Sequence, residues 1–122
     1  MKQPRDHRDH LEDISQAAQK ALEFVEGIAY ENFLGDDKTV YAVVRALEIL
    51  GEATKRIPPE IRDRHPEVPW RSMAGIRDKL VHDYVSVNLE VVWKTVTEDL
   101  PPLLPLVQRV LEETPKEGHR PN

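Results

Sequence analysis

The sequence predicts an all-α fold, a bundle of four or five helices, and three features lead to this class. Near the N-terminus, apolar residues recur at spacings of 3, 4, 3, 4 and 3. A second stretch with helical periodicity ends at a pair of prolines. Hydrophobic residues make up 39% of the 122 residues and charged residues 32%, a balance that fits helices with one apolar stripe each. At this length we expect one domain, residues 1–114, around one core.

The first predicted helix has the pattern of a helix that packs lengthwise on a neighbour. Two small alanines in its stripe would let the neighbour approach closely. The stretch 27–37, which contains glycine, asparagine and aspartate, predicts the end of this helix and a loop. The residues of the stripe are Leu11, Ile14, Ala18, Ala21, Val25 and Ile28.

A second helix is predicted from near Lys38 to Arg56, because Ile57-Pro58-Pro59 follows and proline stops a helix. One face of this helix is expected to be charged, with Arg45, Glu48, Glu52 and Lys55. The opposite face, expected to be buried, consists of Val40, Val44, Leu47, Gly51 and Thr54.

The segment 60–68 is polar and contains prolines, so we expect a connector with one helical turn. Pro69 suits the first position of a third helix, where its missing N–H would have no partner. This helix would turn one set of apolar side chains inward: Trp70, Met73, Ile76, Leu80 and Val81.

Ser86 or Asn88 can cap a fourth helix that contains Leu89, Val92, Trp93 and Val96. Pro101-Pro102 is expected to break or kink the chain before a last helix. Residues 115–122 read as a disordered polar tail. The inward residues of the last helix are expected to be Leu103, Leu106, Val107, Val110 and Leu111.

Composition excludes several classes of protein. No cysteine is present, which rules out a disulfide or a thiolate zinc site. No apolar run approaches the roughly 18 residues of a membrane helix, and Met1 to His10 is too polar for a signal peptide, so a cytoplasmic protein without a cofactor is expected. The net charge of −5 argues against broad, non-specific nucleic-acid binding. A local basic pocket could still form from Arg71, Arg77 and Lys79.

The most informative motif is R-x-x-x-x-H-x-Y, formed by Arg77, His82 and Tyr84. Arginine holds phosphate oxygens through paired N–H bonds, and histidine, with an ordinary pKa of about 6.5, exchanges protons near neutrality. Together they suit cleavage of RNA without a metal. In an unbroken helix the two side chains would point roughly 140° apart. They can meet only if the helix ends near His82 or if two copies of the chain share a cleft.

A purely structural interpretation of these residues is also open. Arg77 could be a solvated side chain paired with an acidic residue, and His82 could favour a helix C-terminus through the helix dipole. Tyr84 could pack its ring and leave its hydroxyl in water.

The motif, together with Trp70, Met73, Val91-Val92-Trp93 and the segment 46–53, resembles the signature of the HEPN domains, and specifically of the HepT-like toxins. The resemblance covers nearly all of residues 11–111. It implies a homodimer whose paired motifs line one groove, with Arg77 and His82 as ribonuclease residues. It also implies that Tyr84 accepts AMP from a cognate nucleotidyltransferase antitoxin.

Accessory roles are expected at three acidic residues. Asp78 and Asp83 flank the motif and could orient His82 or raise its pKa, and Glu52 would lie near the dimer cleft in the HEPN resemblance. All three can equally be solvated or ion-paired charges. A different function also remains open: a non-catalytic HEPN module that only docks the nucleotidyltransferase or a nucleotide.

A weaker signal lies at the N-terminus. Asp6, His10 and Asp13 fall on one helical face at a spacing that could bind a divalent metal. The alternative is a polar N-terminus whose acidic residues favour the start of a helix. We favour the second interpretation and predict no metal site. For Glu48 and Glu52, a face of salt bridges with neighbouring basic residues is preferred over paired catalytic carboxylates.

Overall fold

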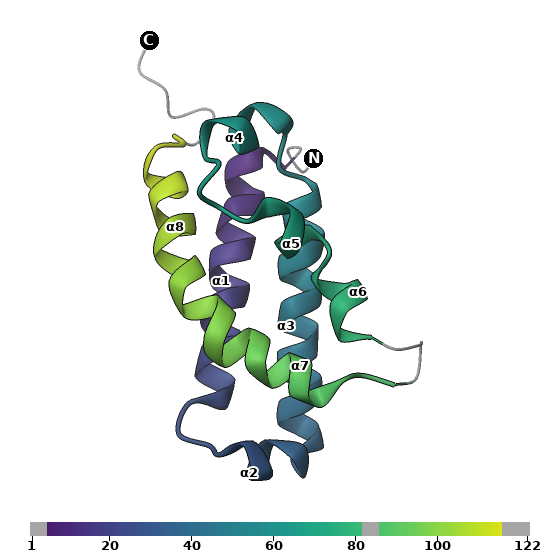
Figure 1. Ribbon diagram of the computed structural model, residues 1–122. Helices are drawn as coiled ribbons and strands as arrows, with labels where there is room; N and C mark the ends of the chain where they lie inside the picture. Colours follow the sequence, from purple (N-terminus) through teal and green to yellow (C-terminus); the bar gives the residue numbers. More distant parts are fainter. Residues whose placement is uncertain (1–4, 82–85, 116–122) are drawn as a thin grey trace.

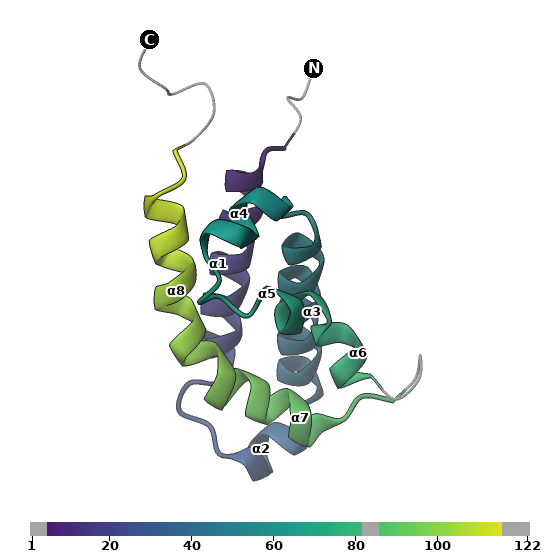
Figure 2. The same ribbon diagram turned by 45° about the horizontal axis from the view of Figure 1, so that its top comes forward.

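The computed structural model describes residues 5–81 and 86–115, and these residues are helical apart from their connections and an isolated bridge between Val81 and Val87. The all-α prediction is thus confirmed for this part of the chain. Two long helices, α1 and α3, run side by side in opposite directions, and α8 packs along α1 (Figure 1). The short helices α5 and α6 cross the other long helix, α3, as the tilted view also shows (Figure 2).

The helical segments in the described residues are more numerous than predicted. The long helices α1 and α3 each contain 19 residues. In chain order the segments are α1 (His7–Val25), α2 (Tyr30–Leu34), α3 (Asp37–Lys55), α4 (Pro59–Arg64), α5 (Trp70–Ala74), α6 (Ile76–Leu80), α7 (Leu89–Lys94), the π-helical turn η1 (Thr95–Asp99) and α8 (Leu100–Glu112).

Helix α1 follows the predicted apolar stripe up to Val25, and all of the stripe residues within the helix are buried. Asp6 and Asp9 form a reciprocal capping box at its start. The helix ends sooner than Ile28, because Gly27 adopts a left-handed backbone with φ of 76°.

The loop expected at 27–37 contains a short helix, α2, so this part of the prediction is wrong. Phe33 of α2 is fully buried, and its ring centroid lies 5.1 Å from that of Trp93. Tyr30 also packs on Trp93, with 5.7 Å between the ring centroids. These ring contacts anchor the segment against α7 and hold it in a turn of helix.

Helix α3 matches its predicted range to within one residue at each end. Asp36 caps it by accepting hydrogen bonds from the hydroxyl and backbone N–H of Thr39, and these bonds lower the pKa of the Asp36 carboxyl. The buried face is rotated from the predicted one: Val40 and Val44 are only half-buried. Its fully buried large side chains are Val43, Leu47 and Leu50.

The predicted third helix is divided in two, which corrects the expectation of one helix from Pro69. Gly75 ends α5 and precedes α6, because glycine has little preference for helical backbone. Pro69 is the N-cap of α5 rather than its first residue. Four of the five side chains predicted to point inward are buried: Trp70, Met73, Ile76 and Leu80; Val81 is only partly buried.

Of the break or kink predicted at Pro101-Pro102, the break is absent, because the chain continues from α7 through η1 into α8 without a gap (Figure 1). The Leu100 N–H donates to the Thr95 carbonyl, five residues back. This wider turn leaves room for proline rings that would meet the carbonyl four residues earlier in an α-helix. The predicted cap is confirmed at Asn88, whose side chain accepts from the Val91 N–H.

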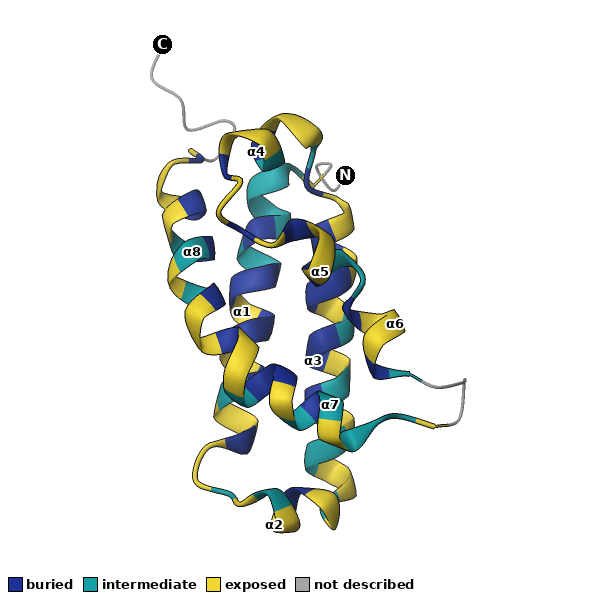
Figure 3. Ribbon diagram, viewed as in Figure 1, coloured by how far each residue is buried: buried dark blue, intermediate teal, exposed yellow. Residues whose placement is uncertain are grey.

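Figure 3 shows the consequence of these patterns, with buried residues turned toward the interior of the bundle and exposed residues outward. Residues 116–122, most of the predicted tail, lie outside the described residues. None of the helices in the described ranges combines the length and apolar character needed to cross a membrane.

Gly51 fixes how closely α6 approaches α3, and this yields the first prediction. A Cβ atom at this position would lie 2.8 Å from Ile76 Cγ2 and 3.3 Å from the Met73 carbonyl oxygen. Gly51→Ala is therefore expected to lower the free energy of unfolding by about 1–3 kcal/mol in a urea titration. Gly35→Ala is the control, because a Cβ there meets only the Asn32 carbonyl at 4.0 Å. An equal loss of unfolding free energy in the two variants would contradict the close approach of α6 to α3.

Candidate active site

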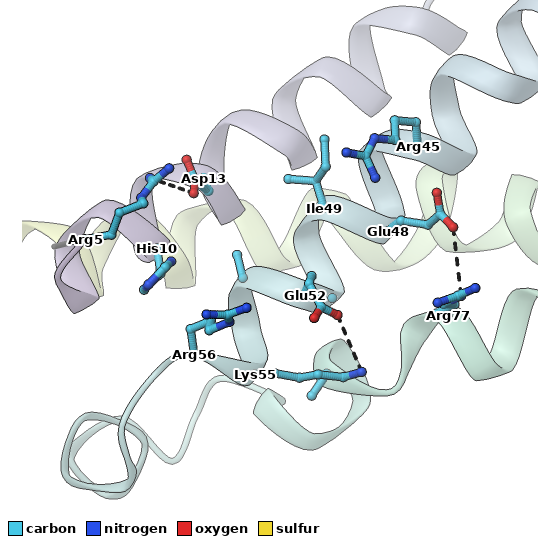
Figure 4. A pocket seen from close by; sticks show the side chains of 13 residues that line it. Arg5, His10, Asp13, Arg45, Glu48, Ile49, Glu52, Lys55, Arg56 and Arg77 are labelled. Atoms are coloured by element: carbon cyan, nitrogen blue, oxygen red, sulfur yellow. Dashed lines mark ion pairs between the residues drawn. The ribbon is translucent and has the colours of Figure 1, made fainter. Parts of the chain in front are cut away.

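Arg77 lies in the first turn of α6 and points toward α3. Burial of Ile76 against Gly51 places this turn beside the middle of α3. Arg77 Nε is 3.9 Å from Glu48 Oε2, and the arginine side chain is 70% exposed (Figure 4). A guanidinium at that distance and exposure is loosely held and accessible to an anion from solvent.

The other residues of the motif, His82 and Tyr84, lie outside the described residues, as does Asp83. Their neighbours are described. Helix α6 ends at Leu80, and Val81 has extended backbone with φ of −105° and ψ of 125°. The Asn88 N–H donates to the Leu80 carbonyl at 2.8 Å, beside the bridge between Val81 and Val87. The helix thus ends before His82, so the unbroken helix that would separate Arg77 from His82 does not form.

Arg77 lines a hollow of about 540 Å³ between the start of α1, the second half of α3 and the α5–α6 region. Glu52, a predicted accessory residue, lines it too and pairs with Lys55 at 3.6 Å. Asp78 is exposed and is not among the lining residues. The charged side chains around the hollow are Arg5, Asp13, Arg45, Glu48, Glu52, Lys55, Arg56 and Arg77, with His10 beside them (Figure 4).

Five of these side chains are cationic and three are carboxylates, so the side chains that line the hollow have a formal net charge of +2. The whole chain has a net charge of −5. The predicted basic pocket has different members. Arg71 and Lys79 line a separate hollow beside η1 and α8, where Lys79 Nζ is 3.3 Å from Asp99 Oδ2. Successive residues of the short helix α6 point in different directions, which separates Lys79 from Arg77.

Sequence reasoning placed Arg45 on the charged face of α3 but gave neither Arg45 nor Arg56 a role at the site. The signal was present in their spacing. The two arginines are eleven residues apart, which returns to the same side of a helix after three turns.

Two residues of the N-terminal cluster have other partners. Asp6 caps α1, and Asp13 pairs with Arg5 at 2.7 Å. Across residues 5–81 and 86–115, no three His, Asp or Glu side chains gather closely enough to hold a metal ion. The salt-bridged face of α3 is present, although Glu48 pairs with Arg77 on α6 rather than with Arg45.

The family model described as "Ribonuclease HepT-like" matches residues 14–110, which is most of the chain. The chain belongs to the HepT-like ribonuclease family. The match confirms the family suggested by the motif and supports the predicted enzyme class, an endoribonuclease. No solved structure matches the chain.

Three relatives agree with this membership of the HepT-like family. A protein of Thermococcus cleftensis named "Probable ribonuclease HepT" is 54% identical over 81% of this chain and 90% of its own length. A protein of Caldanaerobacter subterraneus subsp. tengcongensis, provisionally named as an RNase, is 42% identical over 93% of this chain and 98% of its own. A similarly named protein of Methanocaldococcus jannaschii is 41% identical over 80% of this chain and 89% of its own.

The exposure of Arg77 predicts that this HepT-like protein does not use it for stability. In a double-mutant cycle of Arg77→Ala and Glu48→Ala, we expect a coupling energy below about 0.5 kcal/mol. Arg62→Ala is the contrasting variant, because its guanidinium donates to the Ile57 and Thr54 carbonyls at 3.0 and 3.1 Å. That substitution is expected to cost about 1–3 kcal/mol. Urea titrations of all variants give the free energies of unfolding. A coupling energy between Arg77 and Glu48 as large as the loss in Arg62→Ala would contradict this prediction.

Proposed function

We propose that the protein is a metal-independent endoribonuclease, the toxin of a toxin–antitoxin pair, with Arg77 and His82 as its catalytic residues. The observation that supports this most is the position of Arg77. Its exposed guanidinium lines a hollow with a positive balance of charge, five residues before His82 and one turn before α6 ends. Membership of a ribonuclease family gives the reaction class.

The proposed chemistry assigns one task to each group. An imidazole of His82 accepts the proton of a ribose 2′-hydroxyl, and that oxygen attacks the adjacent phosphorus. Arg77 holds the non-bridging oxygens as negative charge grows on them. The bond to the 5′ oxygen breaks, and this leaving oxygen takes a proton from a second imidazole. A homodimer supplies that second group, since each protomer contributes one His82.

An apolar groove beside the hollow supports the proposed homodimer. It lies between α1 and α3 and is lined by Phe24 and Ile49, which are 40% and 37% exposed. Arg45 and Asp13 line both the groove and the charged hollow. Covering the part of the groove around Phe24 with a second copy would remove apolar surface from water and leave Arg45 open at the rim of the covered area.

Accessory roles are proposed for acidic residues near the motif. Asp78 and Asp83 would orient His82 or raise its pKa, since a nearby carboxylate favours the charged imidazolium. Glu52, on the wall of the hollow, would position the cations around it through its pair with Lys55.

Tyr84 is the proposed site of regulation. A cognate nucleotidyltransferase antitoxin would transfer AMP to its hydroxyl. A bulky anion two residues from His82 would compete with RNA for Arg77 and repel the RNA backbone. The partners of the protein would then be a second copy, RNA and the antitoxin.

The catalytic proposal predicts cleavage of single-stranded RNA in the presence of EDTA. His82→Ala is expected to reduce the rate by about 10²–10⁴-fold without change in the helical circular dichroism signal. Arg77→Lys is expected to reduce the cleavage rate nearly as much as Arg77→Ala, because lysine keeps the charge but loses the paired N–H geometry.

His7→Ala, at the start of α1, serves as the matched control and should cleave at the parent rate. Equal residual cleavage by parent and His82→Ala would point to a contaminant and favour the non-catalytic module.

The regulatory proposal predicts a covalent mass gain. After co-expression with a neighbouring nucleotidyltransferase, intact-mass measurement should show one or more added AMP units that are lost in Tyr84→Phe. Tyr41→Phe is the control, because Tyr41 is the tyrosine most open to solvent in the described ranges, at 77% exposure. Persistence of the gain in Tyr84→Phe, or its loss in Tyr41→Phe, would place the modification elsewhere.

A further inference from the structure

The charged hollow contains more guanidinium groups than the scissile phosphate needs. Three of its cations are each close to a carboxylate of the hollow: Arg5 to Asp13, Lys55 to Glu52 and Arg77 to Glu48. All three carboxylates are thereby used.

Arg45 and Arg56 account for the remaining positive charge. Neither forms an ion pair or a side-chain hydrogen bond in the part of the chain that the structure describes. Both are exposed, and both line the hollow.

We propose that Arg45 and Arg56 bind two further backbone phosphates of a single-stranded RNA, so that the substrate lies along α3 with Arg77 beside it. This inference rests on the proposed ribonuclease function and extends the same site to two residues that the motif does not contain.

The helix geometry places the two arginines well for this role. Arg45 is in the third turn of α3 and Arg56 is its C-cap residue. Eleven residues correspond to about 16 Å along the axis and a rotation of only about 20°. They therefore project from the same side of α3, far enough apart to reach different phosphates of one strand. Figure 4 shows them at either end of the stretch that carries Ile49 and Glu52.

Arginine side chains also suit the phosphates of an RNA strand better than other basic side chains would. A guanidinium donates paired N–H bonds to phosphate oxygens, and the strand places one phosphate at each nucleotide. Arg77 lines the same hollow as Arg45 and Arg56, so one chain of phosphates can contact all three arginines. A protein with a net charge of −5 can bind RNA in this way because a few local contacts replace a broad electrostatic attraction.

The test measures binding separately from cleavage. The full-length chain with His82→Ala, which would not consume the probe, is titrated with a 5′-labelled single-stranded RNA of mixed sequence over a series of salt concentrations. Arg45→Ala and Arg56→Ala are each expected to weaken binding by about tenfold, as for loss of a charge-assisted hydrogen bond. Each should also reduce the slope of log K against log salt by about 0.7.

Arg109→Ala is the matched control. It removes the same charge from an exposed position on α8, on the wall of none of the hollows described above. Its binding and salt slope should equal those of the parent. Arg56→Lys should keep the salt slope while losing part of the affinity, because a lysine contacts phosphate as a point charge.

Three results would overturn the inference. The first is that Arg45→Ala and Arg56→Ala bind RNA as tightly as Arg109→Ala does, and the second is that the His82→Ala chain does not bind RNA at low salt. The third is that the losses of RNA affinity accompany a change in oligomeric mass measured by sedimentation. The last result would assign the arginines to a protein contact. Failure of the proposed function looks different. RNA would then bind through Arg45 and Arg56 with the predicted salt slopes, while the chain with intact His82 would not cleave it.

Discussion

The close contact between Gly51 and the turn at Ile76 determines the geometry of everything near the motif. Because Gly51 has no side chain, the α5–α6 region lies directly against the middle of α3. The first turn of α6 then projects Arg77 over the charged half of α3. A larger side chain at position 51 would press on Ile76 and the Met73 carbonyl and would therefore displace the segment that carries Arg77. Gly51 therefore determines both how α6 packs on α3 and where Arg77 lies.

The distribution of charge explains how an acidic protein can act on an anionic polymer. The chain has 22 acidic and 17 basic side chains, yet the hollow has five basic and three acidic ones. An excess acidic charge elsewhere disfavours random adsorption of nucleic acid, so binding depends on local contacts. If RNA binds in the hollow as we propose, such an arrangement would favour a substrate that fits the hollow over one that only lies on the surface.

Sequence reasoning succeeded where a pattern was long and local. The stripe of α1, the limits of α3 and the Asn88 cap each follow from residues within a few turns of one another. It failed where tertiary contacts decided the outcome. Phe33 converts an expected loop into helix by packing on Trp93. The wider turn η1 lets the chain stay helical up to the two prolines, where a break was one of the two predicted outcomes. For the site, the predicted basic pocket was assigned by proximity in sequence, which the short α6 does not preserve, because Arg77 and Lys79 line separate hollows.

The carboxylates of the hollow bear on how the proposed site would work. In the absence of RNA, Glu48 lies 3.9 Å from the Nε atom of Arg77, whose side chain is 70% exposed. A phosphate could therefore bind this guanidinium at little cost, which agrees with the weak coupling expected between the two side chains. In the proposed mechanism, a phosphorane-like transition state carries more negative charge than a phosphodiester, so the same guanidinium would hold it more strongly than the substrate. Arg45 and Arg56 have no carboxylate partner among the described residues, which would suit them to holding the strand while Arg77 acts on the scissile phosphate.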